Sequence, residues 1–222
     1  MTAHVDVVFL DVGGVLYSDT PYERSLMRAL REMGATFTDE EYAASYMECR
    51  RAQHGSFRRR LARRFLGSDE RAAELSARAE PYWRYESDAL FPDVRDCVQE
   101  LCRQYRLGLI ANQLGAVREA LERDGLAGAF EIWAISEELG VEKPDPRIFE
   151  AAVREADVGP HRAVMCGDRL DYDVEPARSA GMKTVWVLRG EAPDHPTEEQ
   201  LSVPDASVRS LEDLPAAIEG LR

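Results

Sequence analysis

The residues best placed to do chemistry begin with Asp11, a single carboxylate at the end of an apolar run, residues 7–10 (VVFL). The length and β-branched content of this run are typical of a buried parallel strand, and open α/β sheets bind their ligands at the carboxyl ends of such strands. Two glycines at 13 and 14 allow a sharp turn and a close approach of the backbone to a bound group. A carboxylate presented in this way suits a nucleophile or a metal ligand, and it equally suits capping of the turn after the strand.

Three later segments carry polar groups in comparable positions. A second strand-like run at 105–111 ends before Asn112, and a loop places Lys143 just before a proline-punctuated helix start. A further apolar run, AVMC, precedes GDRLDYD, which contains Asp168, Asp171 and Asp173. Three strands would thus deliver polar groups at their carboxyl ends, and a loop would add an amine, which is an arrangement not expected by chance.

The amine at position 143 contrasts with the rest of the chain. Of its 28 basic residues, 26 are arginines, and only Lys143 and Lys183 are lysines. A compact ammonium is the point charge that a phosphoryl-binding site can use. Lys183 shows that a lysine also occurs here in an ordinary position before a strand.

The four motifs together resemble those of the haloacid dehalogenase-like hydrolase superfamily, in its helical-cap type. The matching stretches are DVGGVL, ANQ, EKPDP and GDRLDYD, and AGMKTVWV and PDASVRSLEDL are similar to the last core strands of that family. The resemblance therefore spans nearly the whole chain. It implies an α/β fold with a Rossmann-like, three-layer parallel-sheet core and an inserted all-helical cap.

The pattern along the chain agrees with this organisation. Residues 17–88 read as amphipathic helices without a strong strand pattern, whereas strands and helices alternate after residue 89. We therefore predict a core formed by residues 1–16 and 89–222 and a helical cap formed by residues 17–88.

The resemblance also implies a reaction, the hydrolysis of a small phosphorylated metabolite through an aspartyl-phosphate on Asp11. In this interpretation Lys143 is catalytic and, with Asn112 and Gly14, holds the phosphoryl oxygens. Mg²⁺ is the expected cofactor, since it prefers oxygen ligands. Its predicted site consists of Asp11, the backbone carbonyl of Gly13, Asp168 and Asp173, with Asp173, alone or with Asp171, orienting the metal-bound waters.

Two positions depart from the family pattern. Phosphatases of this family usually carry an Asp two residues after the nucleophile, where this chain has Gly13, and a Ser or Thr where it has Ala111. The missing Asp would normally act as general acid and base, a contribution of roughly 10²–10⁴-fold in rate. Two alternatives therefore stay open beside the phosphatase. One is a non-catalytic or regulatory protein that binds metal or a phosphorylated ligand, and the other is a 2-haloacid dehalogenase, which needs neither general acid nor metal.

Composition limits the partners and the location. The net charge of −13 disfavours nucleic acid. No apolar run approaches the roughly 20 residues of a membrane span, and no secretory signal is indicated. Cys49, Cys97, Cys102 and Cys166 lack metal or redox spacing and are predicted to be buried thiols in a reducing compartment. We therefore expect a cytoplasmic monomer or homodimer.

Two segments have less specific interpretations. Seven arginines without an intervening acid lie within residues 50–64. They could attract anionic substrates, or they could form a solvated helix face paired with acids elsewhere in the chain. We favour the solvated face. Tyr17, Tyr22 and Tyr46 could line the cap interface, although aromatic residues at helical spacing belong more often to a core. The Pro- and acid-rich residues 189–205 are predicted to form a surface loop.

Overall fold

A single parallel sheet organises the core of the protein in the computed structural model, which describes residues 4–221. Its spatial order is β3-β2-β1-β4-β5-β6. The strands are β1 (Val7–Leu10), β2 (Arg106–Ala111), β3 (Phe130–Ile135), β4 (Ala163–Gly167), β5 (Lys183–Val187) and β6 (Ala206–Val208). The chain adds strands to one side of β1 and then to the other, so the carboxyl ends of β2, β1 and β4 lie side by side at the switch point.

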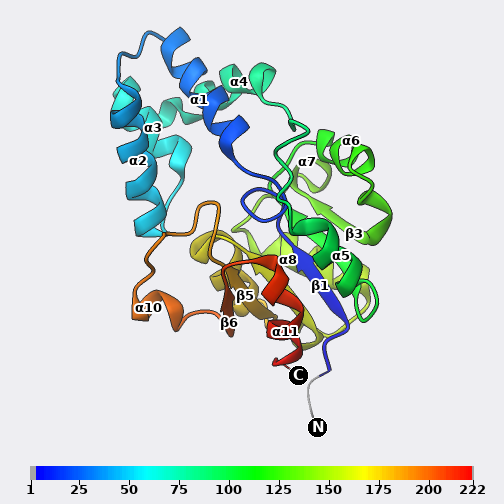
Figure 1. The fold of residues 1–222 in the computed structure, drawn as a ribbon. Coiled ribbons are helices and arrows are strands. Elements are labelled where there is room, and N and C mark those ends of the chain that lie inside the picture. The colour runs from blue at the N-terminus through cyan, green and yellow to red at the C-terminus, as the bar shows by residue number, and fades with distance from the viewer. Residues whose placement is uncertain (1–3, 222) are drawn as a thin grey trace.

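Helices cover both faces of this sheet because its strands are buried on both sides. Val8 and Leu10 belong to the apolar cluster shared with α5, α6 and α11, whereas Val7 and Phe9 pack in a second cluster with α8 and α9. Figure 1 shows α5 and α11 on the face toward the viewer. The core helices are α5 (Val94–Leu101), α6 (Ala116–Arg123), α7 (Ser136–Leu139), α8 (Pro146–Ala156), α9 (Glu175–Ser179), α10 (Glu198–Leu201) and α11 (Leu214–Glu219). The predicted three-layer α/β fold is confirmed.

A separate group of helices lies over the carboxyl edge of the sheet, at the upper left of Figure 1. It consists of α1 (Thr20–Glu32), α2 (Asp39–Ala52), α3 (Phe57–Leu66) and α4 (Ala72–Ala79). These helices enclose an apolar cluster of their own, in which Leu26, Leu61 and Leu75 are fully buried. We refer to this group as the cap.

The chain enters and leaves the cap through two adjacent segments. The Ser18 N–H donates to the Ala89 carbonyl at 2.8 Å, and the Phe91 N–H donates to the Leu16 carbonyl at 3.0 Å. Tyr17 and Leu90 form an antiparallel bridge between these bonds. The chain therefore passes between core and cap at residues 16–18 and 89–91, and the boundaries at 16/17 and 88/89 stay a prediction.

Two of the sequence expectations need correction. Residues 189–205 are not only a surface loop: α10 lies within them, because Thr197 and Gln200 form a reciprocal capping box. Cys102 is exposed, whereas the other three cysteines are buried as expected, and all four are free thiols. Among residues 4–221, no helix has both the length and the apolar character needed to cross a membrane.

The arginine-rich cap segment is mainly a solvated, paired surface, as we favoured. Ion pairs join Arg50 to Asp194, Arg63 to Asp69, and both Arg60 and Arg64 to Glu48. Arg58 differs, because it lines the cavity described below.

Candidate active site

The loops that follow β1 and β4 bring Asp11 and Asp168 together at the switch point of the sheet. The Asp11 N–H donates to the Cys166 carbonyl at 2.9 Å, so Asp11, the first residue beyond β1, is still hydrogen-bonded to β4. One carboxylate oxygen from each of Asp11, Asp168 and Asp173 lies within 4.8 Å of the other two. All three residues are buried. The sequence-predicted acids therefore converge, as the strand-end argument required.

Lys143 provides the positive charge of this cluster. Its Nζ lies 2.8 Å from Oδ1 of Asp11 and 2.6 Å from Oδ1 of Asp173, and its side chain is almost completely buried. The Asn112 amide fixes the backbone of this lysine, since its Oδ1 accepts from the Lys143 N–H at 2.6 Å and its Nδ2 donates to the Lys143 carbonyl at 2.9 Å. Asn112 lines the cavity, but both ends of its amide are engaged, so it positions the lysine in this structure. A direct bond to a phosphoryl group stays a prediction.

The electrostatics of the cluster reflect burial and a shortage of positive charge. Burial raises the pKa of Asp11 to about 7, against the lowering effect of the Lys143 ammonium. Burial, followed by the charges of Asp19 and Asp173, raises the pKa of Asp168 well above its usual range. Burial disfavours the Lys143 ammonium, but the charges of Asp11 and Asp173 outweigh it and raise the pKa of that lysine. Lys143 therefore stays charged while it compensates the acids only in part.

The donor set fits a hard divalent cation. Ligands about 2.1 Å from a shared Mg²⁺ lie at most about 4.2 Å apart, so the three oxygens need only small adjustments to reach one ion. Among the described residues, no hydrogen bond involves Oδ2 of Asp11 or Oδ1 of Asp168. Both oxygens of Asp173, by contrast, accept hydrogen bonds, from Lys143 at 2.6 Å and from the Arg169 N–H at 2.9 Å. Asp173 is thus better placed to orient the site than to ligate the ion, and the carbonyl of Gly13 stays a predicted ligand.

Gly14 has a role other than the predicted one. Its N–H donates to the Tyr17 carbonyl at 2.8 Å and is not directed to a ligand. Its φ of +67° is a left-handed conformation, and a methyl group at this position would lie 2.0 Å from Oδ2 of Asp168. Gly14 therefore makes room for Asp168, and the geometry does not support phosphate binding by its N–H.

Asp171 also lies elsewhere than predicted. Its carboxylate pairs with Arg169 at 2.7 Å and accepts the N–H of Gly55, in the cap, at 2.8 Å. Gln53 donates to the Glu191 carbonyl at 2.7 Å and accepts from the Leu170 N–H at 2.9 Å. The loop between α2 and α3 is thus bonded to the loop after β4, and Asp171 joins cap to core instead of orienting metal-bound waters.

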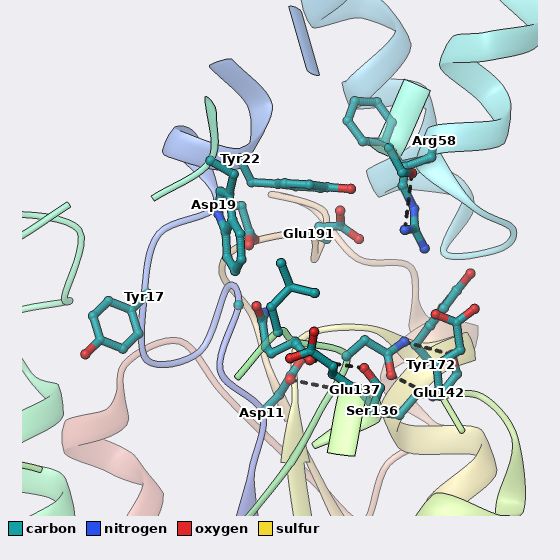
Figure 2. Close-up of a pocket in the computed structure, with 18 of the residues that line it drawn as sticks. Asp11, Tyr17, Asp19, Tyr22, Arg58, Ser136, Glu137, Glu142, Tyr172 and Glu191 are labelled. Carbon is teal, nitrogen blue, oxygen red and sulfur yellow. Dashed lines mark hydrogen bonds and ion pairs between the residues drawn. The ribbon is translucent and has the colours of Figure 1, made fainter. Parts of the chain in front are cut away.

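A cavity of about 790 Å³ lies between the cap and the acid cluster. Figure 2 shows Asp11 at its floor, Asp19 and Glu191 on the side that faces the cap, and Tyr22 projecting from the cap. Arg58 of α3 enters from the cap side (Figure 2) and donates to the Ser76 hydroxyl at 3.4 Å. Trp83 and Tyr85 add aromatic surface to the lining. The cavity is therefore enclosed by residues from both parts of the chain.

The three tyrosines singled out in the sequence have different positions. Tyr22 lines the cavity, whereas Tyr46 packs in the apolar cluster of the cap. The ring of Tyr17 points away from the cavity centre (Figure 2), and its hydroxyl donates to Asp124 at 2.7 Å. Tyr17 therefore contributes mainly to the core.

Sequence reasoning missed Asp19 and Glu191, two acids that line the cavity. Burial, then the charges of Glu191 and Asp11, raise the pKa of Asp19 well above its ordinary value. The Glu191 carboxylate pairs with Arg169 at 2.5 Å, and its N–H donates to Asp168 at 2.6 Å. An acid at the start of a helix was a signal for Asp19, but such acids usually serve as caps. Glu191 lies in the segment that we predicted to be a surface loop.

A buried carboxylate at a strand end, an ammonium beside it and two further acids lie beneath the cap, which is an arrangement that suits a hydrolase of the α/β class. The family model described as haloacid dehalogenase-like hydrolase matches residues 5–181, and the chain belongs to this family. Glyceraldehyde 3-phosphate phosphatase of Methanopyrus kandleri is 33% identical over 217 residues, which cover 92% of this chain and 93% of that protein. Phosphoserine phosphatase of Thermus thermophilus is 37% identical over 180 residues, which cover 78% of this chain and 70% of the relative.

A solved structure supports the same fold. The crystal structure of a predicted phosphoglycolate phosphatase from Haemophilus somnus has a TM-score of 0.76 against this chain at 18% identity, and covers 98% of this chain and 99% of its own. At this level of identity the likeness concerns the fold alone.

Proposed function

We propose that this hydrolase is a Mg²⁺-dependent phosphatase that removes phosphate from small monoesters through an aspartyl-phosphate on Asp11. The observation that carries the proposal is the position of the Asp11 carboxylate at the cavity floor, 2.8 Å from the Lys143 ammonium and within reach of Asp168. The phosphatase relatives support the same reaction class.

The arrangement gives each side chain a distinct task. Asp11 attacks phosphorus with one carboxylate oxygen and faces the cation with the other, while the Val12 N–H at 2.7 Å and the Lys143 ammonium fix the orientation of the carboxylate through Oδ1. Lys143 offsets the charge of the transferring phosphoryl group, and Asp173 keeps that ammonium in place. When bound by Asp11 and Asp168, Mg²⁺ supplies the positive charge that lets an anionic phosphate approach a carboxylate.

The shape of the cavity favours a small substrate. Its walls combine aromatic residues with Arg58, a cap side chain placed to face an anionic or hydroxylated part of the substrate. The named substrates of the two relatives, glyceraldehyde 3-phosphate and phosphoserine, are of that size. We propose a small phosphorylated metabolite, and a cytoplasmic location consistent with the four free thiols.

Phosphate release from a panel of monoesters tests the proposal. The wild type should release phosphate with Mg²⁺ and lose this activity in EDTA, and Asp11→Asn should abolish it. Asp6→Asn is the matched control, since Asp6 lies ahead of the same strand and pairs with Arg162, outside the cavity. A wild type that is inert on the whole panel while it still binds Mg²⁺ would favour the non-catalytic alternative, and retained activity in Asp11→Asn would refute the role of Asp11.

A further inference from the structure

The side chain of Asp19 occupies the space in which a residue at position 13 would project. A methyl group placed on Gly13 would lie 2.8 Å from Oδ1 of Asp19, closer than atoms can pack. A methyl group on Gly14 would lie 3.1 Å from Oδ2 of the same carboxylate. Gly13 has no side chain, and the carboxylate of Asp19 fills the space that a side chain at position 13 would occupy.

The carboxylate of Asp19 has no evident structural task. Asp19 is the residue that precedes α1, a position where Asp normally accepts a hydrogen bond from the first turn, yet its side chain makes no such bond. Within residues 4–221 its carboxylate forms neither an ion pair nor a hydrogen bond. It instead lines the cavity with Asp11 and Gln113, and Figure 2 shows it on the side of the cavity that faces the cap.

We propose that Asp19 is the general acid and base of this phosphatase and supplies from the start of α1 the carboxyl group that Gly13 lacks. The inference rests on the proposed function. It follows from position, because a group that fills the place of a side chain at residue 13 can reach the same atoms of a bound ester as that side chain could.

The proton transfers balance over the two halves of the reaction. An oxygen of Asp11 bonds to phosphorus, the phosphorus–ester oxygen bond breaks, and its electron pair leaves on the ester oxygen, which takes the proton of Asp19. Water then bonds to phosphorus while the Asp19 carboxylate takes one of its protons. The bond between phosphorus and Asp11 breaks with its electron pair returning to Asp11. Inorganic phosphate leaves, and Asp19 is again protonated.

The test compares Asp19→Asn with the wild type on aryl and alkyl phosphates of increasing leaving-group pKa. On alkyl esters the loss in kcat should be roughly 10²–10⁴-fold, as expected for removal of a general acid. On p-nitrophenyl phosphate, whose leaving group needs no proton, the first step should be nearly normal. Loss of the base should then trap the phosphoenzyme, visible as a burst of about one p-nitrophenol per enzyme and as acid-stable label on the protein.

Two further variants separate a catalytic role from a structural one. Glu23→Gln changes the acid one turn further along α1 and should leave the dependence on the leaving group unaltered. The double variant Asp19→Gly with Gly13→Asp moves the carboxylate to position 13, where the space is then free, and should recover part of the activity lost in Asp19→Gly alone. This recovery would also show that loss of folding does not explain the single variant.

The outcomes distinguish the two proposals. If the wild type is active, Asp11→Asn is inactive, and Asp19→Asn shows either no loss or an equal loss on all esters without a burst, then the role of Asp19 is refuted and the phosphatase stands. If the wild type releases no phosphate from any ester, both proposals fail.

Discussion

Replacement of Gly14 by Ala tests how closely the backbone after Asp11 must approach the acid cluster of Asp11, Asp168 and Asp173. The added methyl group would lie 2.0 Å from Oδ2 of Asp168, which must retreat by more than an ångström to reach an ordinary contact of 3.4 Å. That movement breaks the bond from the Glu191 N–H, now 2.6 Å long. An unmade buried hydrogen bond costs about 1–3 kcal/mol, and an L-residue at positive φ costs about 1–2 kcal/mol more.

Gly140→Ala is the matched control for this variant. Gly140 has a φ of +66°, against +67° for Gly14, and a methyl group there would meet no atom within 4 Å. The two variants thus share the backbone cost, and the difference between their free energies of unfolding isolates the displacement of Asp168. We expect Gly14→Ala to be less stable than Gly140→Ala by about 1–3 kcal/mol.

The same displacement should weaken cation binding. Metal ligands tolerate position errors of only about 0.2 Å, so Gly14→Ala should bind Mg²⁺ at least about 10-fold more weakly. Urea unfolding in EDTA gives the stability, and calorimetric titration with Mg²⁺ gives the affinity. If Gly14→Ala bound Mg²⁺ like the wild type and were no less stable than Gly140→Ala, the proposed crowding at Asp168 would be wrong.

Two further predictions concern the charge of Lys143 and the space beside Gly13. Lys143→Met removes the ammonium from Asp11 and Asp173 and should cost about 3–5 kcal/mol in metal-free protein. Burial raises the pKa of Asp11 to about 7 in the folded protein, whereas its pKa in the unfolded chain is near 4. The free energy of unfolding that Asp11 contributes is therefore fully present below about pH 4 and is lost as the pH rises through 7. The variant should steepen this loss in urea unfolding from pH 5 to 8, and a pH-independent loss would contradict the charge argument. Gly13→Asp alone should lower both activity and stability, since Asp19 already fills that space, and faster hydrolysis of alkyl phosphates would refute this reasoning.

The layout of the core and its cluster of acids could be predicted because the buried strands, and the polar residues at their carboxyl ends, are visible in the sequence. Buried apolar runs mark the strands, and open parallel sheets bind their ligands at the carboxyl ends of these strands, so Asp11 and Asp168 were expected at the same edge of the sheet. The convergence of Lys143 could not be derived in this way, since it lies in a loop, and that expectation came from the resemblance to the family. The sequence did not predict which atoms the Asn112 amide contacts, because a motif places a residue near a site without determining the direction of its side chain.

The position of Asp19 could not be predicted, because it depends on how residues 12–18 fold back. The N–H groups of Leu16 and Tyr17 both donate to the Val12 carbonyl, and this compact turn returns the chain over Gly13. No hydrophobic periodicity in the sequence predicts such a turn. Asp171 and Asp173 illustrate the same limit. Although they are two residues apart, Asp171 faces the cap and Asp173 belongs to the acid cluster with Asp11 and Asp168.

The crossing between core and cap has a consequence for how the proposed active site is assembled. Asp11 follows a strand of the sheet, whereas Asp19 stands at the first turn of the cap, beyond the bridge between Tyr17 and Leu90. A carboxyl group at position 13 would belong to the loop that follows the strand before Asp11, whereas the carboxyl group at position 19 belongs to the first turn of the cap. On the proposed roles of Asp11 and Asp19, both proton transfers therefore require the cap to lie against the core as it does here, with the two carboxylates lining one cavity.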